Sequence, residues 1–461
     1  MNMKKLHYLV LVLALLPIIG IASNVPTGDA SSTTSVLSAT NSSSENSNSC
    51  NVTISGLSLA DAITDNTCNE IYIENGTYLI ENTIDIKRPI HISGESKENT
   101  ILQKIGGGSL LLVIRTQDVI VEKLTLDAYT NDSDDDPIYE AFGVFGSNNC
   151  TLLDCLIYGS NHMFAVFFAG PYVDAGKPTI DAFEAGDLDS GNVMEGNYVR
   201  EYSKLDIVSF SLQKNGVVRN NVVEGGVISF FMTRDSECIG NRIENSMTQG
   251  IFVSVPADQN LILNNTVINS AAARIKVAIQ VDHVVDPDAD HKVSLTPTSY
   301  RAKGIVINKN RIQSSNFFGI EMTNTVKAKV ESNSILNSAL SGIYLLRVDE
   351  TTLSKNSILH FGKECFDENF SKFNAGIWGD YKTKSSDISF NKIIASNKVC
   401  AVNAIRINND GTQVNNKVKC NKILGKYEGD EIDVTESSGN KMEECDDRHG
   451  KTRGKHLRGT P

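Results

Sequence analysis

The stretch from Asn333 to Leu346 constrains the fold most, because two other parts of the chain repeat its spacing. In each copy an Asn is followed by Ile two residues later and by Gly-Ile nine and ten residues later, and the copies begin at Asn241, Asn310 and Asn333. Partial copies, with Val or Ile two residues after the Asn, begin at Asn197, Asn221, Asn265, Asn356, Asn391 and Asn421. Several neighbouring copies begin 23 or 24 residues apart, and such a period with occasional insertions predicts a solenoid.

The repeat predicts coils of short β-strands joined by tight turns, because one such coil cannot bury its own apolar face and must stack on its neighbours. Asn tolerates the left-handed backbone conformation that a tight turn needs. We therefore expect the repeated Asn residues to occupy left-handed turns and to hydrogen-bond from coil to coil as a column. The Val or Ile that follows each Asn is expected to point into the core.

These repeats, from about Val119 to Val434, resemble those of the right-handed parallel β-helix repeat family within the pectate-lyase-like superfold. The resemblance implies an all-β chain that forms a right-handed parallel β-helix solenoid. A capping box from Ser58 to Asp61 predicts a short helix through Ile63, which would cover the N-terminal end of the core. The superfold hosts lyases, hydrolases, epimerases and non-catalytic surface proteins, so no specific enzyme family follows from it.

The start of the chain has the composition of a targeting segment. Lys4 and Lys5 precede an apolar run, and small residues at its end suit a cleavage site, which predicts a signal peptide. A permanent membrane helix is the alternative, and the Pro and Gly inside the modest run disfavour it. We expect a signal peptide at 1–22, a disordered Ser/Thr/Asn-rich leader at 23–49, the β-helix at 50–436 and a disordered polar tail at 437–461. The mature protein is then secreted or held at the cell surface, without stable membrane insertion.

The nine cysteines would meet an oxidising compartment. Proximity in the sequence predicts four disulfides, Cys50–Cys68, Cys150–Cys155, Cys365–Cys400 and Cys420–Cys445, and leaves Cys238 as a small buried apolar residue. Sequons at Asn41, Asn51, Asn75, Asn131, Asn149, Asn264 and Asn369 would be surface glycosylation sites in a host that glycosylates, although an Asn-rich repeat also produces such triplets by chance.

The formal net charge of −12 provides no overall positive field. We therefore expect neither nucleic acid nor an anionic membrane as a partner, and any anionic partner needs a local basic patch.

A column of aromatic and charged residues follows the Gly-Ile positions of six successive coils. Its members are Phe252, Lys276, Glu321, Tyr344, Trp378 and Arg406. In a parallel sheet these side chains would lie about 4.8 Å apart from coil to coil on one face. Aromatic rings stack on sugars and cations pair with uronate carboxylates, so the column predicts a groove for an extended, anionic polysaccharide. The alternative is an ordinary exposed face on which Lys276 and Glu321 pair across neighbouring strands.

The candidate catalytic residues are Lys276, Arg274 and Glu321. Arg274 stands where other coils have Gly, and the alternation of its strand predicts that it points outward. Glu321 and Asp380 lie two coils and two residues apart, or roughly 12 Å, which exceeds the 5 to 9.5 Å of glycosidase carboxylate pairs. A lyase or C5 epimerase fits better, because it needs a base for the proton α to a uronate carboxylate and a cation that neutralises that carboxylate. Binding roles are expected for Phe252, Tyr344, Trp378, Asp380 and Arg406.

Motifs of particular enzyme families are mostly missing. Arg274-Ile275-Lys276 matches the R-I-K of polygalacturonases, but the partner motifs of that family are absent. Residues 286–291 resemble the D-P-H-D of alginate epimerases, with Asp288 in the place of the His, so the chemistry of that motif does not carry over.

Alternating aspartates occur in two of three long insertions, which span 128–139, 170–190 and 282–302. Calcium binds such oxygen clusters, and the candidate ligands are Asp132, Asp134, Asp136, Asp286, Asp288 and Asp290. Solvated acidic loops are the alternative. The sequence thus predicts a secreted β-helix protein that acts on or binds acidic polysaccharide, as a lyase or C5 epimerase, with a non-catalytic adhesion or carbohydrate-binding protein as the alternative.

Overall fold

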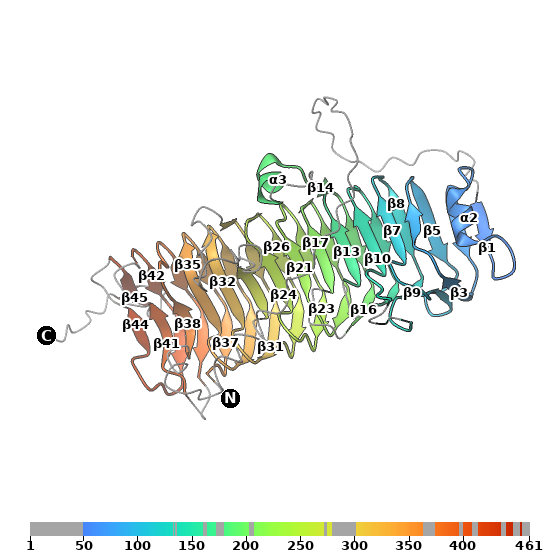
Figure 1. Ribbon diagram of the computed structural model, residues 1–461. Helices are drawn as coiled ribbons and strands as arrows, with labels where there is room; N and C mark the ends of the chain where they lie inside the picture. The colour runs from blue at the N-terminus through green and yellow to red at the C-terminus, as the bar shows by residue number, and fades with distance from the viewer. Residues whose placement is uncertain are drawn as a thin grey trace, which may run out of the picture.

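The computed structural model describes residues 49–131, 133, 136–159, 164–171, 179–201, 207–271, 274–278, 301–362, 374–395, 400–407, 414–434, 439–445 and 452–453. The chain winds into an elongated stack of coils that runs from β1 and α2 at one end to β44 and β45 at the other (Figure 1). Successive coils add one strand to each of three long sheets, here called A, B and C. The strands of these sheets pair in parallel, apart from β45 with β46.

In spatial order, sheet A contains β1 (Ser49–Val52), β2 (Glu70–Ile73), β5 (Ile90–Gly94), β8 (Val119–Glu122), β11 (Thr151–Leu153), β15 (Val193–Glu195), β19 (Val217–Arg219), β22 (Glu237–Ile239), β26 (Leu261–Leu263), β30 (Val306–Asn308), β33 (Lys329–Glu331), β36 (Thr352–Ser354), β39 (Asp387–Ser389), β42 (Lys417–Lys419), β45 (Lys441–Cys445) and β46 (Thr452–Arg453).

Sheet B contains β3 (Gly76–Ile80), β6 (Thr100–Lys104), β9 (Thr125–Asp127), β12 (Leu156–Tyr158), β16 (Tyr198–Arg200), β20 (Val222–Glu224), β23 (Arg242–Glu244), β27 (Thr266–Ile268), β31 (Arg311–Ser315), β34 (Ser334–Ser338), β37 (Ser357–Leu359), β40 (Lys392–Ile394) and β43 (Lys422–Leu424).

Sheet C contains β4 (Ile84–Ile86), β7 (Leu111–Ile114), β10 (Phe142–Phe145), β13 (Val166–Ala169), β17 (Val208–Ser211), β21 (Ile228–Phe231), β24 (Ile251–Ser254), β28 (Ile275–Ala278), β32 (Ile320–Val326), β35 (Ile343–Asp349), β38 (Ala375–Gly379), β41 (Asn403–Ile407) and β44 (Ile432–Val434), with β25 (Ala257–Asp258) and β29 (Ala302–Lys303) at its edge. A separate pair joins β14 (Asp189–Ser190) to β18 (Gln213–Lys214).

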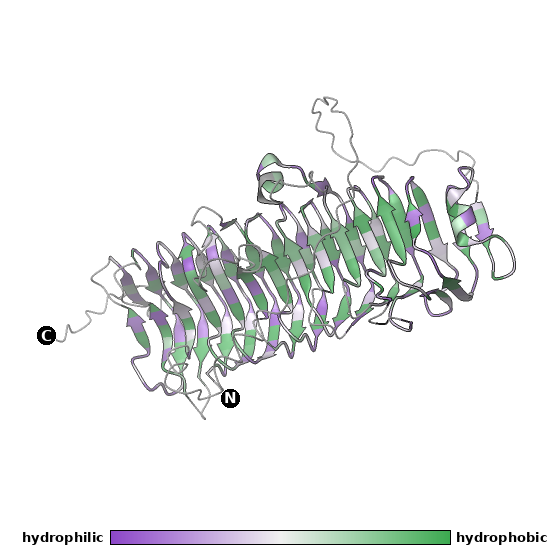
Figure 2. Ribbon diagram, in the orientation of Figure 1, coloured by the Kyte–Doolittle hydropathy of each residue, from purple (hydrophilic) through white to green (hydrophobic). Residues whose placement is uncertain are grey.

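Alternating side chains build the core between the three sheets. In sheet B, for example, Ile335 of β34 is fully buried while Ser334 before it is exposed. Figure 2 shows the resulting mixture of hydrophobic and hydrophilic residues along the strands. Phe142, Phe168 and Phe210 continue this core in sheet C, where rings of neighbouring coils lie 6.0 and 4.4 Å apart. The predicted all-β parallel solenoid is therefore confirmed.

The repeated Asn residues form the predicted column at the turn from sheet A to sheet B. Asn310 Nδ2 donates to Asn333 Oδ1 at 3.0 Å, and Asn333 Nδ2 donates to Asn356 Oδ1 at 2.9 Å. The same contacts run from Asn197 to Asn421. The predicted left-handed backbone lies one residue earlier, for example at Lys309 (φ 54°) and Ser332 (φ 57°). The side-chain bonds, and not backbone tolerance, therefore explain the Asn positions.

The Gly of the Gly-Ile pair has a steric cause. A Cβ atom on Gly342 would lie 2.3 Å from Ile358 Cγ2, and one on Gly319 would lie 2.5 Å from Ile335 Cγ2. At this corner between sheets B and C, a side chain in place of the Gly hydrogen would point into the core and meet the aliphatic residue of the next coil. Gly therefore lets the corner close tightly.

The predicted helix closes the N-terminal end of the stack. It forms α2 (Leu59–Thr64), and the Ser58 side chain accepts a hydrogen bond from the Asp61 N–H. Leu59, Ala62 and Ile63 are buried against the first coil. Arg88 donates to the carbonyl oxygens of Ile63, Asp65 and Cys68, which fixes the segment that follows the helix.

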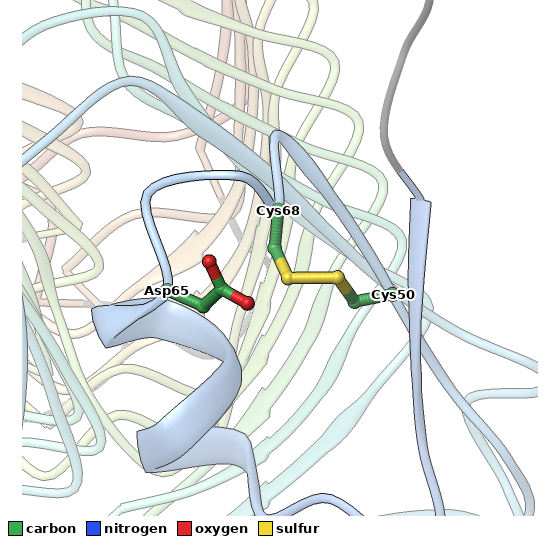
Figure 3. Close-up of side chains that lie close together, drawn as sticks. All are labelled: Cys50, Asp65 and Cys68. Carbon is green, nitrogen blue, oxygen red and sulfur yellow. A yellow bond between two sulfur atoms is a disulfide. The ribbon is translucent and has the colours of Figure 1, made fainter.

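Two predicted disulfides are present, one near each end of the stack. The Cα atoms of Cys50 and Cys68 lie 5.6 Å apart, and those of Cys420 and Cys445 lie 4.8 Å apart. Figure 3 shows the first of them beside Asp65. The atoms of this trio lie close enough for a metal ion, but the two sulfur atoms are bonded to each other and the Asp65 carboxylate accepts hydrogen bonds from Thr67. The trio is therefore a structural feature of the cap.

The predicted Cys150–Cys155 disulfide is wrong, because both residues are buried free thiols. They lie on either side of strand β11, which separates their Cα atoms by more than about 10 Å, beyond the reach of a disulfide. Cys238 is buried and free, as predicted. Cys400 is disulfide-bonded, and its predicted partner Cys365 lies outside the described residues.

The segments around the β-helix differ from the predictions at one end. Strand β45 pairs with β42 inside the stretch predicted to be a disordered tail, so the stack continues beyond residue 436. The predicted signal peptide and nearly all of the leader lie outside the described residues. No helix in the described ranges is long and apolar enough to cross a membrane. The insertion at 170–190 contains α3 (Thr179–Ala185), which lies outside the stack (Figure 1).

Candidate functional site

The predicted column of residues exists on the outer face of sheet C. The strand register pairs Phe252 with Lys276, Lys276 with Glu321 and Glu321 with Tyr344. It continues from Tyr344 to Trp378 and from Trp378 to Arg406. The column has one more member that was not predicted from the sequence, Asp433 on β44, which pairs with Arg406. Seven coils therefore present these side chains in one line along the stack.

Lys276 and Glu321 form the charged centre of this line. Lys276 Nζ lies 3.8 Å from Glu321 Oε1, and their side chains are 27% and 14% exposed. An ammonium and a carboxylate in this arrangement offer a positive charge and a proton acceptor at adjacent points of an accessible face. The pair also matches the predicted alternative, an ordinary cross-strand ion pair.

Tyr344 connects this centre to Asp380. Its hydroxyl donates to Asp380 Oδ2 at 3.0 Å, and Asp380 directly follows β38. Burial raises the pKa of Tyr344, and the negative charges of Asp380 and Glu321 raise this pKa further. Tyr344 is therefore a hydrogen-bond donor at neutral pH, and the candidates for a base are the lysine and the carboxylates.

The aromatic part of the column is packed and not open. Trp378 is 2% exposed and Tyr344 is 9% exposed, within a cluster that also contains Phe318, Leu340 and Ala375. The rings of Phe318 and Tyr344 stack at 4.6 Å, and those of Tyr344 and Trp378 lie 5.1 Å apart. The expectation of exposed stacking platforms is therefore not met here, because neighbouring side chains occupy the ring faces.

Phe252 is 7% exposed and packs against Val227. At the other end of the column, the Arg406 guanidinium lies 5.9 Å from the centre of the Trp378 ring, and Arg406 Nε lies 3.6 Å from Asp433 Oδ2. These contacts hold Arg406 along the column.

Arg274 does not lie on this face, which corrects its predicted outward direction. Arg274 stands where other coils have Gly, at the corner between sheets B and C. Its side chain is fully buried, and Nη1 donates to the Val267 carbonyl oxygen at 2.9 Å. Among the described residues, its buried Nε and Nη2 atoms have no hydrogen-bond partner. Burial lowers the pKa of Arg274 to about 9, so the guanidinium stays charged at neutral pH. Arg274 therefore cannot contact a ligand on the outer face of sheet C.

Small hydroxyl side chains precede the charged centre on the same face. Ser209, Ser229 and Ser254 are all buried, and Ser229 pairs in register with Phe252. Sequence reasoning missed Ser209 and Ser229 because their coils lack the Gly-Ile pair, and it missed Ser254 because this residue lies two positions beyond Phe252 on the same strand.

The candidate calcium ligands lie mostly outside the described residues, namely Asp132, Asp134, Asp286, Asp288 and Asp290. Asp136 is described, and its Oδ2 accepts a hydrogen bond from the Gly107 N–H at 2.7 Å. This contact anchors the insertion to an earlier coil. Calcium binding at either aspartate series stays a prediction.

Comparison with solved structures shows similar folds at low sequence identity. The A-module of the mannuronan C-5 epimerase AlgE6 from Azotobacter vinelandii has a TM-score of 0.53 and 13% identity, covering 81% of this chain and 89% of that one. The catalytic domain of a GH87 α-1,3-glucanase, in complex with tetrasaccharides, has a TM-score of 0.55 and 14% identity, covering 88% and 71%. The periplasmic alginate epimerase AlgG has a TM-score of 0.53 and 11% identity, covering 81% and 84%.

These likenesses identify the fold as a right-handed parallel β-helix, in agreement with the resemblance found in the sequence. No family model matches the sequence, and no curated protein matches it.

Proposed function

We propose that this protein is a secreted enzyme that acts on an acidic polysaccharide by β-elimination or C5 epimerisation, at the face of sheet C around Lys276 and Glu321. The observation that carries the proposal is the position of Lys276 Nζ, 3.8 Å from Glu321 Oε1 on an accessible part of that face. The epimerases and the glucanase with similar folds act on polysaccharides, by their names, which supports a glycan as the ligand.

In this proposal the Lys276 ammonium pairs with the carboxylate of a uronate residue and stabilises the negative charge that develops when the neighbouring carbon loses its proton. Glu321 accepts that proton. Tyr344 stays protonated and holds Asp380 by its hydrogen bond, which keeps the second carboxylate in place. In an elimination, the bond from C4 to the glycosidic oxygen breaks as the C4–C5 double bond forms, and the leaving oxygen takes a proton from solvent, which gives an unsaturated sugar. In an epimerisation, a proton from solvent adds to C5 from the opposite face, and the proton on Glu321 passes to solvent.

The spacing of the carboxylates disfavours a glycoside hydrolase. Glu321 pairs with Tyr344, Tyr344 pairs with Trp378, and Asp380 lies two residues beyond Trp378. Two strand spacings and a two-residue offset give roughly 12 Å, too far for the carboxylate pair of a glycosidase.

Matched variants of Glu321 and Lys276 test the proposal. Glu321→Gln removes the proton acceptor and is expected to reduce turnover by about 10²- to 10⁴-fold. Lys276→Arg keeps the positive charge and is expected to retain turnover within about tenfold, because an arginine can still pair with the uronate. Ultraviolet absorbance of unsaturated products, after incubation with pectate, alginate or glycosaminoglycans, detects a lyase, and exchange of the C5 proton with solvent detects an epimerase.

A non-catalytic adhesion or carbohydrate-binding protein, with its ligand site away from this column, is the second candidate, and the packed aromatic cluster favours it. Trp378 and Tyr344 have little surface left for a sugar, and Lys276 and Glu321 already satisfy each other. Glycan binding without elimination or proton exchange, unchanged in Glu321→Gln, would support this second candidate and overturn the enzyme.

A further inference from the structure

A second surface, at the corner where the chain passes from sheet C to sheet A, has the opposite charge to the protein as a whole. The strand register places Lys214, Arg234, Asp258, Lys303, Asp349 and Lys384 in one column at this corner, with Val326 between Lys303 and Asp349. We call this column the C–A ridge. It spans seven coils, or roughly 29 Å at about 4.8 Å per coil. Four cations and two acids stand here in a chain whose formal net charge is −12.

The acids of the ridge are already neutralised by its cations. Asp258 Oδ2 lies 3.3 Å from Arg234 Nε, and Asp349 Oδ2 lies 3.4 Å from Lys384 Nζ and 3.8 Å from Arg301 Nη1. Lys303 is exposed and has no carboxylate within ion-pair distance in the described part of the chain. The ridge therefore keeps an excess of positive charge for an external anion.

A hollow of about 320 Å³ opens in the middle of the ridge. It is lined by Arg234, Asp258, Lys303 and Lys327, together with Asp235, Gln259 and Gly304. Lys327 is 70% exposed, and its Nζ lies 3.8 Å from a carboxylate oxygen of the exposed Glu350. An ion pair this exposed is weak, so Lys327 can still bind an external anion. Two lysines from adjacent coils thus border a space large enough for a sugar residue.

An exposed ring lies beside the far end of the ridge. Tyr381 is 36% exposed, with the Arg347 guanidinium 5.5 Å and Lys382 Nζ 5.0 Å from its centre. Tyr381 is thus much more exposed than Trp378, and the exposed part of the ring can contact a sugar.

We propose that the C–A ridge is a binding site for a linear anionic polysaccharide, separate from the Lys276–Glu321 face. A single small anion does not need cations along seven coils, whereas an extended chain with carboxylate or sulfate groups contacts several of them at once. A polysaccharide fits better than a nucleic acid, because the ridge also contains Asp258 and Asp349. Their oxygens can accept hydrogen bonds from the many hydroxyl groups of a sugar chain, groups that a DNA backbone lacks.

The proposal is tested by measuring binding with isothermal titration calorimetry for the double variant Lys303→Gln/Lys327→Gln. Its control is Lys392→Gln/Lys422→Gln, which removes the same charge from two exposed lysines paired across sheet B. The probes are a polyuronate oligosaccharide, a heparin oligosaccharide, a neutral glucan oligosaccharide and a single-stranded oligonucleotide.

We expect the ridge variant to lose about tenfold in affinity for at least one of the two anionic oligosaccharides, while the control stays within about twofold of the parent. Binding by the parent should weaken with added salt. Equal losses in both double variants, no binding of either anionic oligosaccharide, or equally tight binding of the oligonucleotide would overturn the proposal. Thermal unfolding of each variant confirms that the fold is kept.

This site does not depend on the proposed reaction, and the two failures are distinguishable. If Glu321→Gln loses turnover but still binds the anionic oligosaccharides, the ridge proposal stands. If the ridge variant binds these oligosaccharides as the parent does, while Glu321→Gln still abolishes turnover on short substrates, only the ridge proposal is refuted.

Discussion

Replacing Asn333 by Leu should destabilise the middle of the solenoid strongly, because the Asn333 side chain makes four hydrogen bonds inside the turn between sheets A and B. Its Oδ1 accepts from Asn310 N and Nδ2, both at 3.0 Å, and its Nδ2 donates to Ile307 O and Asn356 Oδ1, both at 2.9 Å. The residue is 1% exposed, so water cannot replace these partners.

The Leu side chain leaves two buried N–H groups of Asn310 without acceptors. Each such group costs about 1 to 3 kcal/mol, so the two together are expected to lower the free energy of unfolding by roughly 2 to 6 kcal/mol. The matched control is Asn308→Leu on the outer face of sheet A in the preceding coil, which should cost less than about 1 kcal/mol. Urea unfolding gives the two stabilities, and hydrogen exchange of the Asn310 amide reports the local effect. Equal stabilities of the two variants would refute the role of the column.

Asn333→Asp separates hydrogen bonding from side-chain shape. The Asp keeps one acceptor oxygen but directs its second oxygen at two other acceptors, so the folded protein favours the protonated acid. The pKa of this group is then higher in the folded than in the unfolded state, and stability is lost as pH rises through the folded pKa. The gap between this variant and the parent should narrow from pH 7 to pH 4. A gap that does not change with pH would contradict the assigned donor and acceptor atoms.

Three further predictions follow from buried groups. Arg274→Met should raise stability by about 1 to 3 kcal/mol in urea unfolding, because it fills the space of a buried cation whose Nε and Nη2 have no partner in the described part of the chain. Arg274→Ala should gain less because it leaves a cavity, and lower stability of the Met variant would show that the cation is needed. Burial raises the pKa of Asp189 to about 7, so the stability of the parent should fall as pH rises from 4 towards 8. Asp189→Asn should be more stable than the parent by roughly 2 kcal/mol at pH 8 but not at pH 4. Parallel pH profiles of the two proteins would contradict this. Mass mapping after alkylation under denaturing, non-reducing conditions should show modified Cys150, Cys155 and Cys238 and bridged Cys50–Cys68 and Cys420–Cys445, and a Cys150–Cys155 bridge would contradict the structure.

The sequence was sufficient for the β-helix and the column on sheet C because both depend on periodicity. The spacing of Asn310, Asn333 and Asn356 predicts the length of one coil. Alignment of the coils then predicts the strand register that pairs Lys276 with Glu321. A repeat fixes which residues share a face, since every coil must stack on the next.

Other features were not predictable from alternation. Arg274 lies at the corner before its strand, where the turn sets the side-chain direction, and the Gly residues at equivalent positions were the available signal that this direction is inward. Alternation places Trp378 on the outer face but does not reveal that Phe318 and Tyr344 lie in the same cluster as Trp378. Cys150 and Cys155 are close in sequence, yet the strand between them separates them in space.

The Asn column also shows how this architecture can vary. Asn265 and Asn310 are 45 residues apart in the chain, but Asn265 Nδ2 still donates to Asn310 Oδ1 at 3.0 Å, the same length as between Asn310 and Asn333, which are 23 residues apart. Additional residues between two coils therefore leave the register unchanged. A sheet-C face can acquire, lose or exchange an insertion without any change in the coils beneath it, so binding specificity and structural stability are free to evolve, or to be engineered, separately.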